Sequence, residues 1–445
     1  MTNLVHNKIV ILKMSLLNFA KSNISQNMFF PKKIFPFLFL SLHLHAQAPL
    51  NALLDDDVMG ENWASVKFHP VGQPLQMPIM DLQGGSLLLS FDDLDADIKR
   101  LYYTVQHCDA DWKPSQLEQQ EFMIGFNEEQ ITKYHAAFNT LIPYMHYELN
   151  LPNENISFTK SGNYTLKIFD DLSNKKALIT RRFVISESLA TVIPQITFSN
   201  VTKYNTHQEF DFQLVAKSYR ISNPLIEVRA TILQNNRWDK SLSNIAPLYV
   251  KGDEIQFDYQ DKIVFSGGKE FRQVDLRSTR MRSERVARLE RGNETWDYTL
   301  FADVDRSGMP YLFDKDANGN YVIESKDSDQ SEVKGDYVNT HFTLKINELD
   351  SGDVYVMGSF VDWKLRPFCK MKFDGKAYET DILLKQGYYN YQYVVVQPKE
   401  QPNFEVLEGS SYETENDYTI IMYHRPFGAR YDRVIGISRF SSTQK

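Results

Sequence analysis

Cysteine is scarce in this sequence: only Cys108 and Cys369 occur among 445 residues. Two cysteines cannot build the disulfide framework on which small secreted scaffolds depend, so that class of protein is excluded. No CxxC or HxxxH pattern supplies the ligand spacing of a zinc site either. We expect both cysteines to be free thiols that are buried as small hydrophobic side chains.

Long apolar runs are missing beyond residue 46, where no segment approaches the roughly 18 consecutive apolar residues of a transmembrane helix. The apolar stretch 34–44 before it is too short to span a membrane. It follows a Lys-Lys pair and leads to the small residue Ala46, an order that is typical of a secretory signal peptide. We expect residues 1–46 to be a cleaved signal, with Met28 as an alternative start of translation, and the remainder to be exported.

Positive charge is also in deficit, since the formal net charge is −8. The predicted signal contains five lysines and no acidic residue, so the exported part is more negative still. This balance argues against nucleic acid and against an anionic membrane surface as partners.

Helical periodicity is nearly absent, and the segment that shows it runs from Asn127 to Phe138, with an approach from Ser115. Elsewhere apolar and polar residues alternate over short stretches such as 144–151, and turn signals separate these stretches. The aromatic content of 13% also suits β-sheet. We therefore predict an all-β fold of three Ig-like, E-set-type β-sandwich domains in series, with a helical or irregular insertion in the first. The predicted domains are 47–190, 191–335 and 336–445.

The run Gln106–Trp112 carries most of the groups that could support catalysis. A hydrolase would rest on His107, Asp109 and Asp111. On a strand His107 and Asp109 share one face and Cys108 faces away, so a Cys–His nucleophile pair cannot form between neighbours. No G-x-S-x-G motif is present. We predict that the protein is not an enzyme and uses no cofactor, and that the run ends a strand in an Asp-rich turn covered by Trp112.

A calcium site is the alternative reading of a second polar loop. Asp314, Asp316 and Asn318 match the start of a D-x-D-x-N-G calcium loop. The bidentate Glu that an EF-hand needs at position 12 is replaced by Ser325. Since Asn-Gly is itself a strong turn signal, we expect a hairpin turn here rather than a metal site.

Arginine is concentrated in one segment of this acidic chain. Seven arginines occupy 20 residues: Arg272, Arg277, Arg280, Arg282, Arg285, Arg288 and Arg291. Such a patch can dock to an acidic protein surface or to lipid headgroups. It can equally be a solvated face whose arginines pair with nearby acids. The candidate partner-binding residues are Arg280, Arg282 and Arg285.

Two segments near the C-terminus, 354–363 and 387–395, resemble the Ig-like glycogen-binding modules, with their G-S-F-x-x-W turn. In that family a pair of tryptophans stacks on sugar rings. Trp363 matches the first, and the second position falls near Tyr378. The resemblance implies, as an alternative function, a periplasmic or surface glycan-binding protein.

A broader resemblance is to the plug proteins of type IX secretion. The matching segments are 106–112, 125–127, 138–144, 151–153, 161–164, 180–183, 413–418 and 425–433. The resemblance implies a non-enzymatic periplasmic protein that closes the inner mouth of a large outer-membrane β-barrel translocon. It also implies a monomer within a hetero-complex with that barrel.

Overall fold

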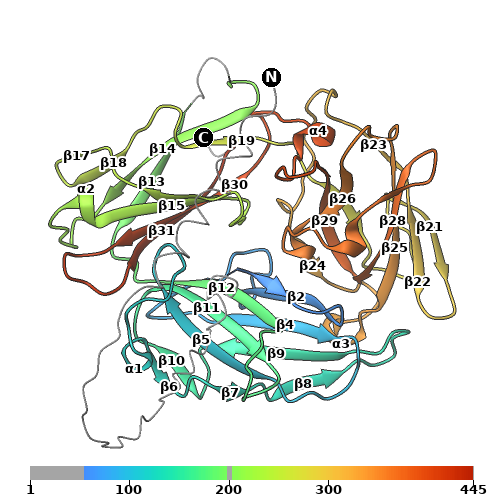
Figure 1. The fold of residues 1–445 in the computed structure, drawn as a ribbon, viewed down its shortest axis with the longest axis horizontal. Helices are drawn as coiled ribbons and strands as arrows, with labels where there is room; N and C mark the ends of the chain where they lie inside the picture. Colours follow the sequence, from blue (N-terminus) through green and yellow to red (C-terminus); the bar gives the residue numbers. More distant parts are fainter. Residues whose placement is uncertain (1–54, 198–202, 444–445) are drawn as a thin grey trace, which may run out of the picture. The chain divides into compact units, whose positions relative to one another are not determined.

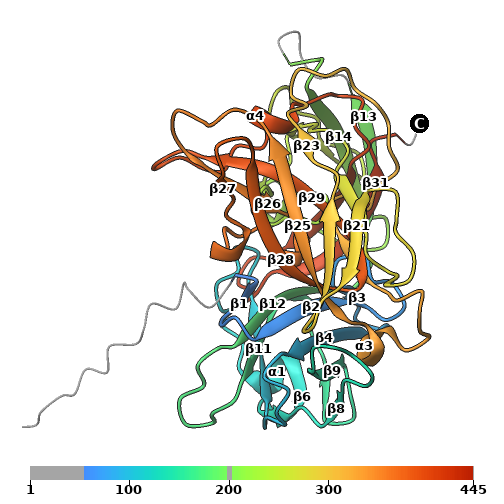
Figure 2. The same cartoon turned by 90° about the vertical axis from the view of Figure 1, so that its right-hand side faces the viewer.

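The computed structural model of the chain describes residues 55–197 and 203–443 (Figures 1 and 2). These residues form β-strands joined by turns and very short helices, which confirms the all-β prediction. The predicted signal peptide, residues 1–46, lies outside the described residues. None of the helices in the described part is long and apolar enough to cross a membrane.

The first sandwich extends over residues 57–186. Its strands are β1 (Asp57–Val58), β2 (Trp63–Pro70), β3 (Ile79–Asp81), β4 (Leu87–Asp93), β5 (Tyr102–Cys108), β6 (Met123–Gly125), β7 (Glu129–Gln130), β8 (Lys133–Ala136), β9 (Met145–Leu151), β10 (Ile156–Phe158), β11 (Gly162–Phe169) and β12 (Ile179–Ser186). One sheet has the order β1-β12-β11-β5-β7 with β3 beside β12, and the other has the order β2-β4-β9-β8. Strands β6 and β10 pair separately.

Alternation of side chains along β5 and β11 explains how the first sheet has two buried faces. Tyr103, Val105, Tyr164 and Leu166 point into the core of the first sandwich. Cys108 belongs instead to a second apolar cluster on the opposite side of the sheet. Both cysteines are free and buried, as predicted.

The second sandwich combines a central part of the chain with its C-terminal end. Its strands are β13 (Thr191–Thr197), β14 (His207–Val215), β15 (Val228–Gln234), β16 (Leu242–Ile245), β17 (Tyr249–Lys251), β18 (Glu254–Phe257), β19 (Val264–Ser266), β30 (Asp417–His424) and β31 (Arg433–Ser441). One sheet runs β13-β14-β18-β17 with β19 beside β14, and the other runs β16-β15-β30-β31. The red strands β30 and β31 therefore lie with the green strands in Figure 1.

The third sandwich lies between these two parts in the sequence. Its strands are β20 (Arg272–Asp275), β21 (Val286–Arg291), β22 (Trp296–Leu300), β23 (Asp303–Val304), β24 (Tyr321–Ile323), β25 (Tyr337–Lys345), β26 (Asp353–Met357), β27 (Lys372–Phe373), β28 (Tyr378–Lys385) and β29 (Gly387–Val396). Strands β20, β24 and β26 pair with β29, while the other sheet has the order β21-β22-β25-β28-β27 with β23 beside β25.

The strand pairing crosses the predicted boundary between residues 335 and 336. Arg272 of β20 lies opposite Tyr391 of β29, and Val228 of β15 lies opposite His424 of β30. Sheets of the second and third sandwiches therefore combine strands from segments 191–335 and 336–445. The domain boundaries and the number of separately folding domains stay predictions.

The predicted helical or irregular insertion in the first sandwich is mostly irregular and extended. Only α1 (Gln119–Phe122) is helical, and it begins after Glu118, which forms a capping box with Glu121. Within Asn127–Phe138, β7 pairs with β5 and β8 pairs with β9. Of the two predicted alternatives, helical and irregular, the helical one was wrong for this part, because pairing with the free edges of two sheets outweighs a weak helical pattern. The other helices are α2 (Pro224–Glu227), α3 (Ser331–Lys334), α4 (Glu405–Glu408) and the 3₁₀ turns Ser359–Val361 and Pro367–Cys369.

A buried polar network joins the first and third sandwiches. The Asp92 carboxylate of β4 lies 2.6 Å from Lys385 Nζ and accepts a 2.7 Å hydrogen bond from the Tyr337 hydroxyl. His146 on β9 lies 2.6 Å from its other oxygen. Asp92, Tyr337 and Lys385 are all 1% exposed or less. Figure 2 shows the orange strands β25 and β28 reaching the blue strands of the first sandwich at this contact.

Candidate functional site

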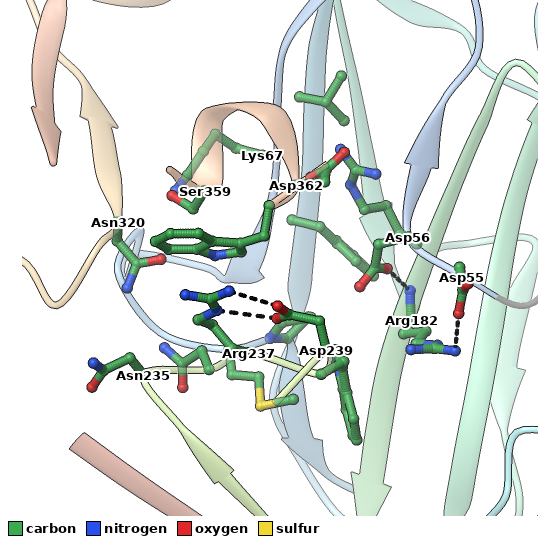
Figure 3. A pocket seen from close by; sticks show the side chains of 18 of the residues that line it. Asp55, Asp56, Lys67, Arg182, Asn235, Arg237, Asp239, Asn320, Ser359 and Asp362 are labelled. Carbon is green, nitrogen blue, oxygen red and sulfur yellow. Dashed lines mark hydrogen bonds and ion pairs between the residues drawn. The ribbon is translucent and has the colours of Figure 1, made fainter. Parts of the chain in front are cut away.

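One candidate site is a cavity of about 470 Å³ at which the three sandwiches meet (Figure 3). Strands β2 and β12 of the first sandwich line one side of it. The segment that follows β15 and two short segments of the third sandwich, Asn320–Tyr321 and Ser359–Lys364, supply the other sides. Its lining includes Lys67, Arg181, Arg182, Asn235, Arg237, Trp238, Asp239, Asn320, Tyr321, Ser359, Asp362, Trp363 and Lys364. No sequence motif predicted this cavity, because its walls come from distant segments.

Ion pairs occupy much of the cavity wall. Arg237 donates two hydrogen bonds to the carboxylate of Asp239, at 2.6 and 3.1 Å. Arg181 of β12 lies 3.2 Å from Asp362, which links the first sandwich to the third. Figure 3 shows Arg237 paired with Asp239 on one side of the cavity. These arginines are thus already compensated by acids.

Lys67 differs from these arginines in its partners. Its ammonium donates a 2.8 Å hydrogen bond to the Tyr321 carbonyl and lies 4.2 Å from the centre of the Tyr321 ring. Among the ion pairs of residues 55–197 and 203–443, none includes Lys67. Burial, together with the nearby Arg181 charge, lowers the pKa of Lys67 to about 7, although Asp362 opposes this shift.

The aromatic pair of the glycan-binding prediction does not form a surface platform. The guanidinium of Arg237 lies 3.8 Å from the centre of the Trp363 ring. Tyr378 is 6% exposed and packs in the core of the third sandwich. A sugar ring therefore cannot stack on both residues. The glycan-binding alternative loses the pair of side chains on which it rested.

In the run Gln106–Trp112, the side chains that a hydrolase would use are bonded to neighbouring residues. His107 contacts Ser115 Oγ at 2.8 Å and the Ser161 carbonyl at 3.1 Å, and its burial lowers its pKa to about 4. Cys108 points to Thr165, and burial raises the pKa of its thiol to about 11. Neither group is poised as a base or a nucleophile at neutral pH.

The remainder of this run forms the predicted Asp-rich turn. The Asp109 amide donates to the Lys113 carbonyl at 2.8 Å, and the exposed Asp111 pairs with Lys113 at 2.7 Å. Trp112 closes the turn and packs edge-on against Trp238, with ring centres 4.7 Å apart. Trp112 thus lies at a contact between the first and second sandwiches. It belongs to the small apolar cluster that contains residues of both.

The loop after β30 docks on this same run. Arg425 lies 3.1 Å from Asp109, and the Ala110 amide donates to the Asp432 carboxylate at 2.9 Å. The Tyr431 ring lies 5.4 Å from His107. Two of the segments on which the plug resemblance rests, 106–112 and 425–433, are therefore one contact between sandwiches. Nothing in the sequence signalled that they meet.

The proposed calcium residues are used in a turn. Asp316 accepts the amides of Asn318 and Phe271, and Asp314 accepts a 2.8 Å hydrogen bond from Gln273. Asn318, with a φ of 51°, stands in the left-handed region that a turn requires. The turn leads into β24 without a paired strand before it, so it is not a hairpin. In the described part of the chain no group of three or more His, Cys, Asp and Glu residues is placed to hold a metal ion.

The arginine segment divides into inward and outward members. Arg272 is 9% exposed and pairs with Glu408 and Asp303, and Arg285 also pairs with Asp303 at 2.6 Å. The side chain of Arg280 is 77% exposed, and its nearest acid, Asp327, is 3.9 Å away. Arg282 is exposed and donates to the Ala287 carbonyl. The outward charge of this segment therefore includes Arg280 and Arg282.

Comparison with known proteins identifies the first sandwich. Residues 64–187 match the family model described as type 9 secretion system plug protein 1st domain. This match confirms the resemblance to the plug family for that region. No curated protein matches the chain.

One solved structure is similar over most of the chain. It is the 2.30 Å crystal structure of a hypothetical protein from Parabacteroides merdae ATCC 43184, with 29% identity and a TM-score of 0.82. The alignment covers 87% of this chain and 99% of that one. The I9–I11 tandem of titin and the B domain of a biofilm associated protein have TM-scores of 0.12 and 0.16, which support no argument about this fold.

Proposed function

We propose that this chain, whose residues 64–187 belong to the family of type 9 secretion system plug first domains, is a non-enzymatic plug of that system. It would lie in the periplasm and close the periplasmic opening of the outer-membrane barrel translocon when no substrate occupies it. The family match over the first sandwich is the observation that carries this proposal.

The contacts between sandwiches support a role as an occluding body. The network around Asp92 and the cluster around Trp112 both bury side chains from two sandwiches. Such contacts favour a fixed arrangement, because opening them would leave charges and apolar surface exposed or unpaired. The groups that a hydrolase would use are instead bonded to neighbouring residues, as His107 shows.

The outward arginines are the proposed contact with the translocon. Arg280 and Arg282 flank Met281, whose side chain is 72% exposed. An apolar side chain between two unburied cations suits an acidic protein surface with an apolar spot. Arg285 was proposed with them, but its pairing with Asp303 gives it an internal role as well.

The test of this function uses the intact cell envelope. Removing the protein should make the outer membrane permeable to large solutes, and a tagged copy should retain a large outer-membrane barrel on purification. The Arg280→Glu, Arg282→Glu double variant is the matched probe of the proposed contact. Unchanged permeability together with no barrel in the purified material would refute the plug function. Binding of a soluble oligosaccharide instead would favour the glycan-binding alternative.

A further inference from the structure

The cavity at which the three sandwiches meet contains, at one end, polar groups whose hydrogen bonding is incomplete. The Ser359 hydroxyl is buried and has no hydrogen-bond partner within the described residues. Lys67, on the same wall, has a carbonyl partner but no carboxylate in an ion pair. A buried hydroxyl without a partner is uncommon, and each such group calls for a physical explanation.

Both residues are bonded to the same short segment, Lys67 through its ammonium and Ser359 through its backbone amide. Lys67 Nζ bonds to the Tyr321 carbonyl at 2.8 Å, and the Ser359 amide bonds to the Gly319 carbonyl at 3.1 Å. Because these carbonyls are two residues apart, the ammonium and the hydroxyl lie at the same end of the cavity (Figure 3).

The charges around Lys67 leave this end cationic. Arg181 faces it from β12, and Asp362 faces it from the third sandwich but is paired with Arg181. His69, on the same strand, is a further titratable group: burial lowers its pKa, and the Lys67 charge lowers it further. The acids elsewhere along the wall are bonded too: Asp239 pairs with Arg237, and Asp56 accepts the backbone amide of Arg182.

The rest of the wall suits a ligand with a ring and hydroxyl groups. The Trp363 indole and the Asn320 side chain also line the cavity. An amide and an indole can contact the hydroxyls and the apolar face of a small ring. The volume of about 470 Å³ lies within the usual range for small-molecule sites.

We propose that the cavity binds a carboxylate-bearing organic molecule of about the size of a sugar acid, with its carboxylate against Lys67 Nζ and Ser359 Oγ. The carboxylate accepts a hydrogen bond from each group and supplies the missing negative charge. A neutral sugar of the same size satisfies the hydroxyl but leaves the ammonium uncompensated. This site is independent of the plug function.

The direct test is calorimetric titration of the full exported chain with three probes: glucuronate, glucose and inorganic phosphate. We expect glucuronate to bind at least about tenfold more tightly than the other two, which corresponds to one charge-assisted interaction. Equal binding of glucose would overturn the requirement for an anion. Binding of phosphate alone would overturn the organic ligand, and binding of none of the three would overturn the site.

Variants at two lysines of the same cavity separate a ligand role from a structural one. Lys67→Met should reduce glucuronate affinity at least about tenfold. Lys364→Met is the matched control, since Lys364 also lines the cavity but pairs with Asp57 at 3.1 Å. It should bind glucuronate like the wild type. Equal loss in both variants, or in neither, would contradict the assignment of Lys67.

A pH series on the unmodified chain keeps the test valid if Lys67→Met does not fold. Since the free lysine titrates near pH 7, affinity should fall by up to about tenfold per pH unit above that value, and binding should take up a proton. Lys67→Arg stays charged and should keep its affinity at pH 9. A pH-independent affinity in the wild type would show that Lys67 does not hold the carboxylate.

Discussion

Asp109 and Arg425 lie 3.1 Å apart, although 316 positions separate them in the sequence. The contact joins the turn after β5 in the first sandwich to the loop between β30 and β31 in the second. Asp432 adds a second carboxylate, 3.6 Å from the same guanidinium. The two most distinctive segments of the sequence therefore serve one interface.

Replacing Arg425 with Ala should weaken this interface. The two carboxylates that it compensates would then face each other, and burial with Asp432 nearby already raises the pKa of Asp109. Since the Arg425 side chain is 37% exposed, we expect a loss of only about 1 kcal/mol in the free energy of unfolding. Denaturant titration measures it, with Lys113→Ala, from an exposed ion pair, as the control. Additivity of Arg425→Ala with Asp109→Asn would show that the two residues are not coupled.

Removal of the Lys385 charge should be far more damaging. Lys385→Met leaves the Asp92 carboxylate buried without its main cation, and breaking such a pair typically costs about 3–5 kcal/mol. Adding Asp92→Asn should recover part of the loss, because the uncompensated charge disappears. Lys345→Met, on the exposed end of β25, is the control and should change stability little. If the double variant lost as much free energy of unfolding as the two single variants together, this account would be contradicted.

His107 should make stability depend on pH in the acidic range. Burial lowers its pKa from about 6.5 to about 4, so the folded state favours the neutral ring. The neutral His107 ring therefore contributes fully to the free energy of unfolding above pH 6.5. This contribution, about 3 kcal/mol in total, is lost as the pH falls toward 4. The difference between wild type and His107→Gln across this range isolates it. The exposed His135→Gln is the control variant, measured over the same pH range.

Charge reversal at Arg280 and Arg282 should slow association with the translocon without unfolding the protein. Exposed rim charges act mainly on encounter, so the variant should also lose much of the salt dependence of its association rate. Arg285→Glu should instead lower the melting temperature, because it places a second carboxylate beside Asp303. If all three substitutions left association and melting unchanged, the segment would be a solvated face.

Much of the local structure could be predicted from the sequence. Alternation along segments such as 337–345 reports which side chains are buried, because a strand has a side-chain period of two residues. The Asp-rich turn, the packing of Trp112 and the buried cysteines follow from short-range chemistry of the same kind. The plug resemblance also rests on short segments, and the match of residues 64–187 confirms it there.

What only the tertiary structure decided depends on which distant segments meet. The return of β30 to β15, the contact of Asp109 with Arg425, and the cavity around Lys67 each combine segments with no shared local pattern. The same holds for the arginines, since Arg272 and Arg280 look alike in the sequence but one is buried against Glu408 and the other is exposed. Strand propensity is a property of each segment by itself, whereas pairing and burial depend on its partners.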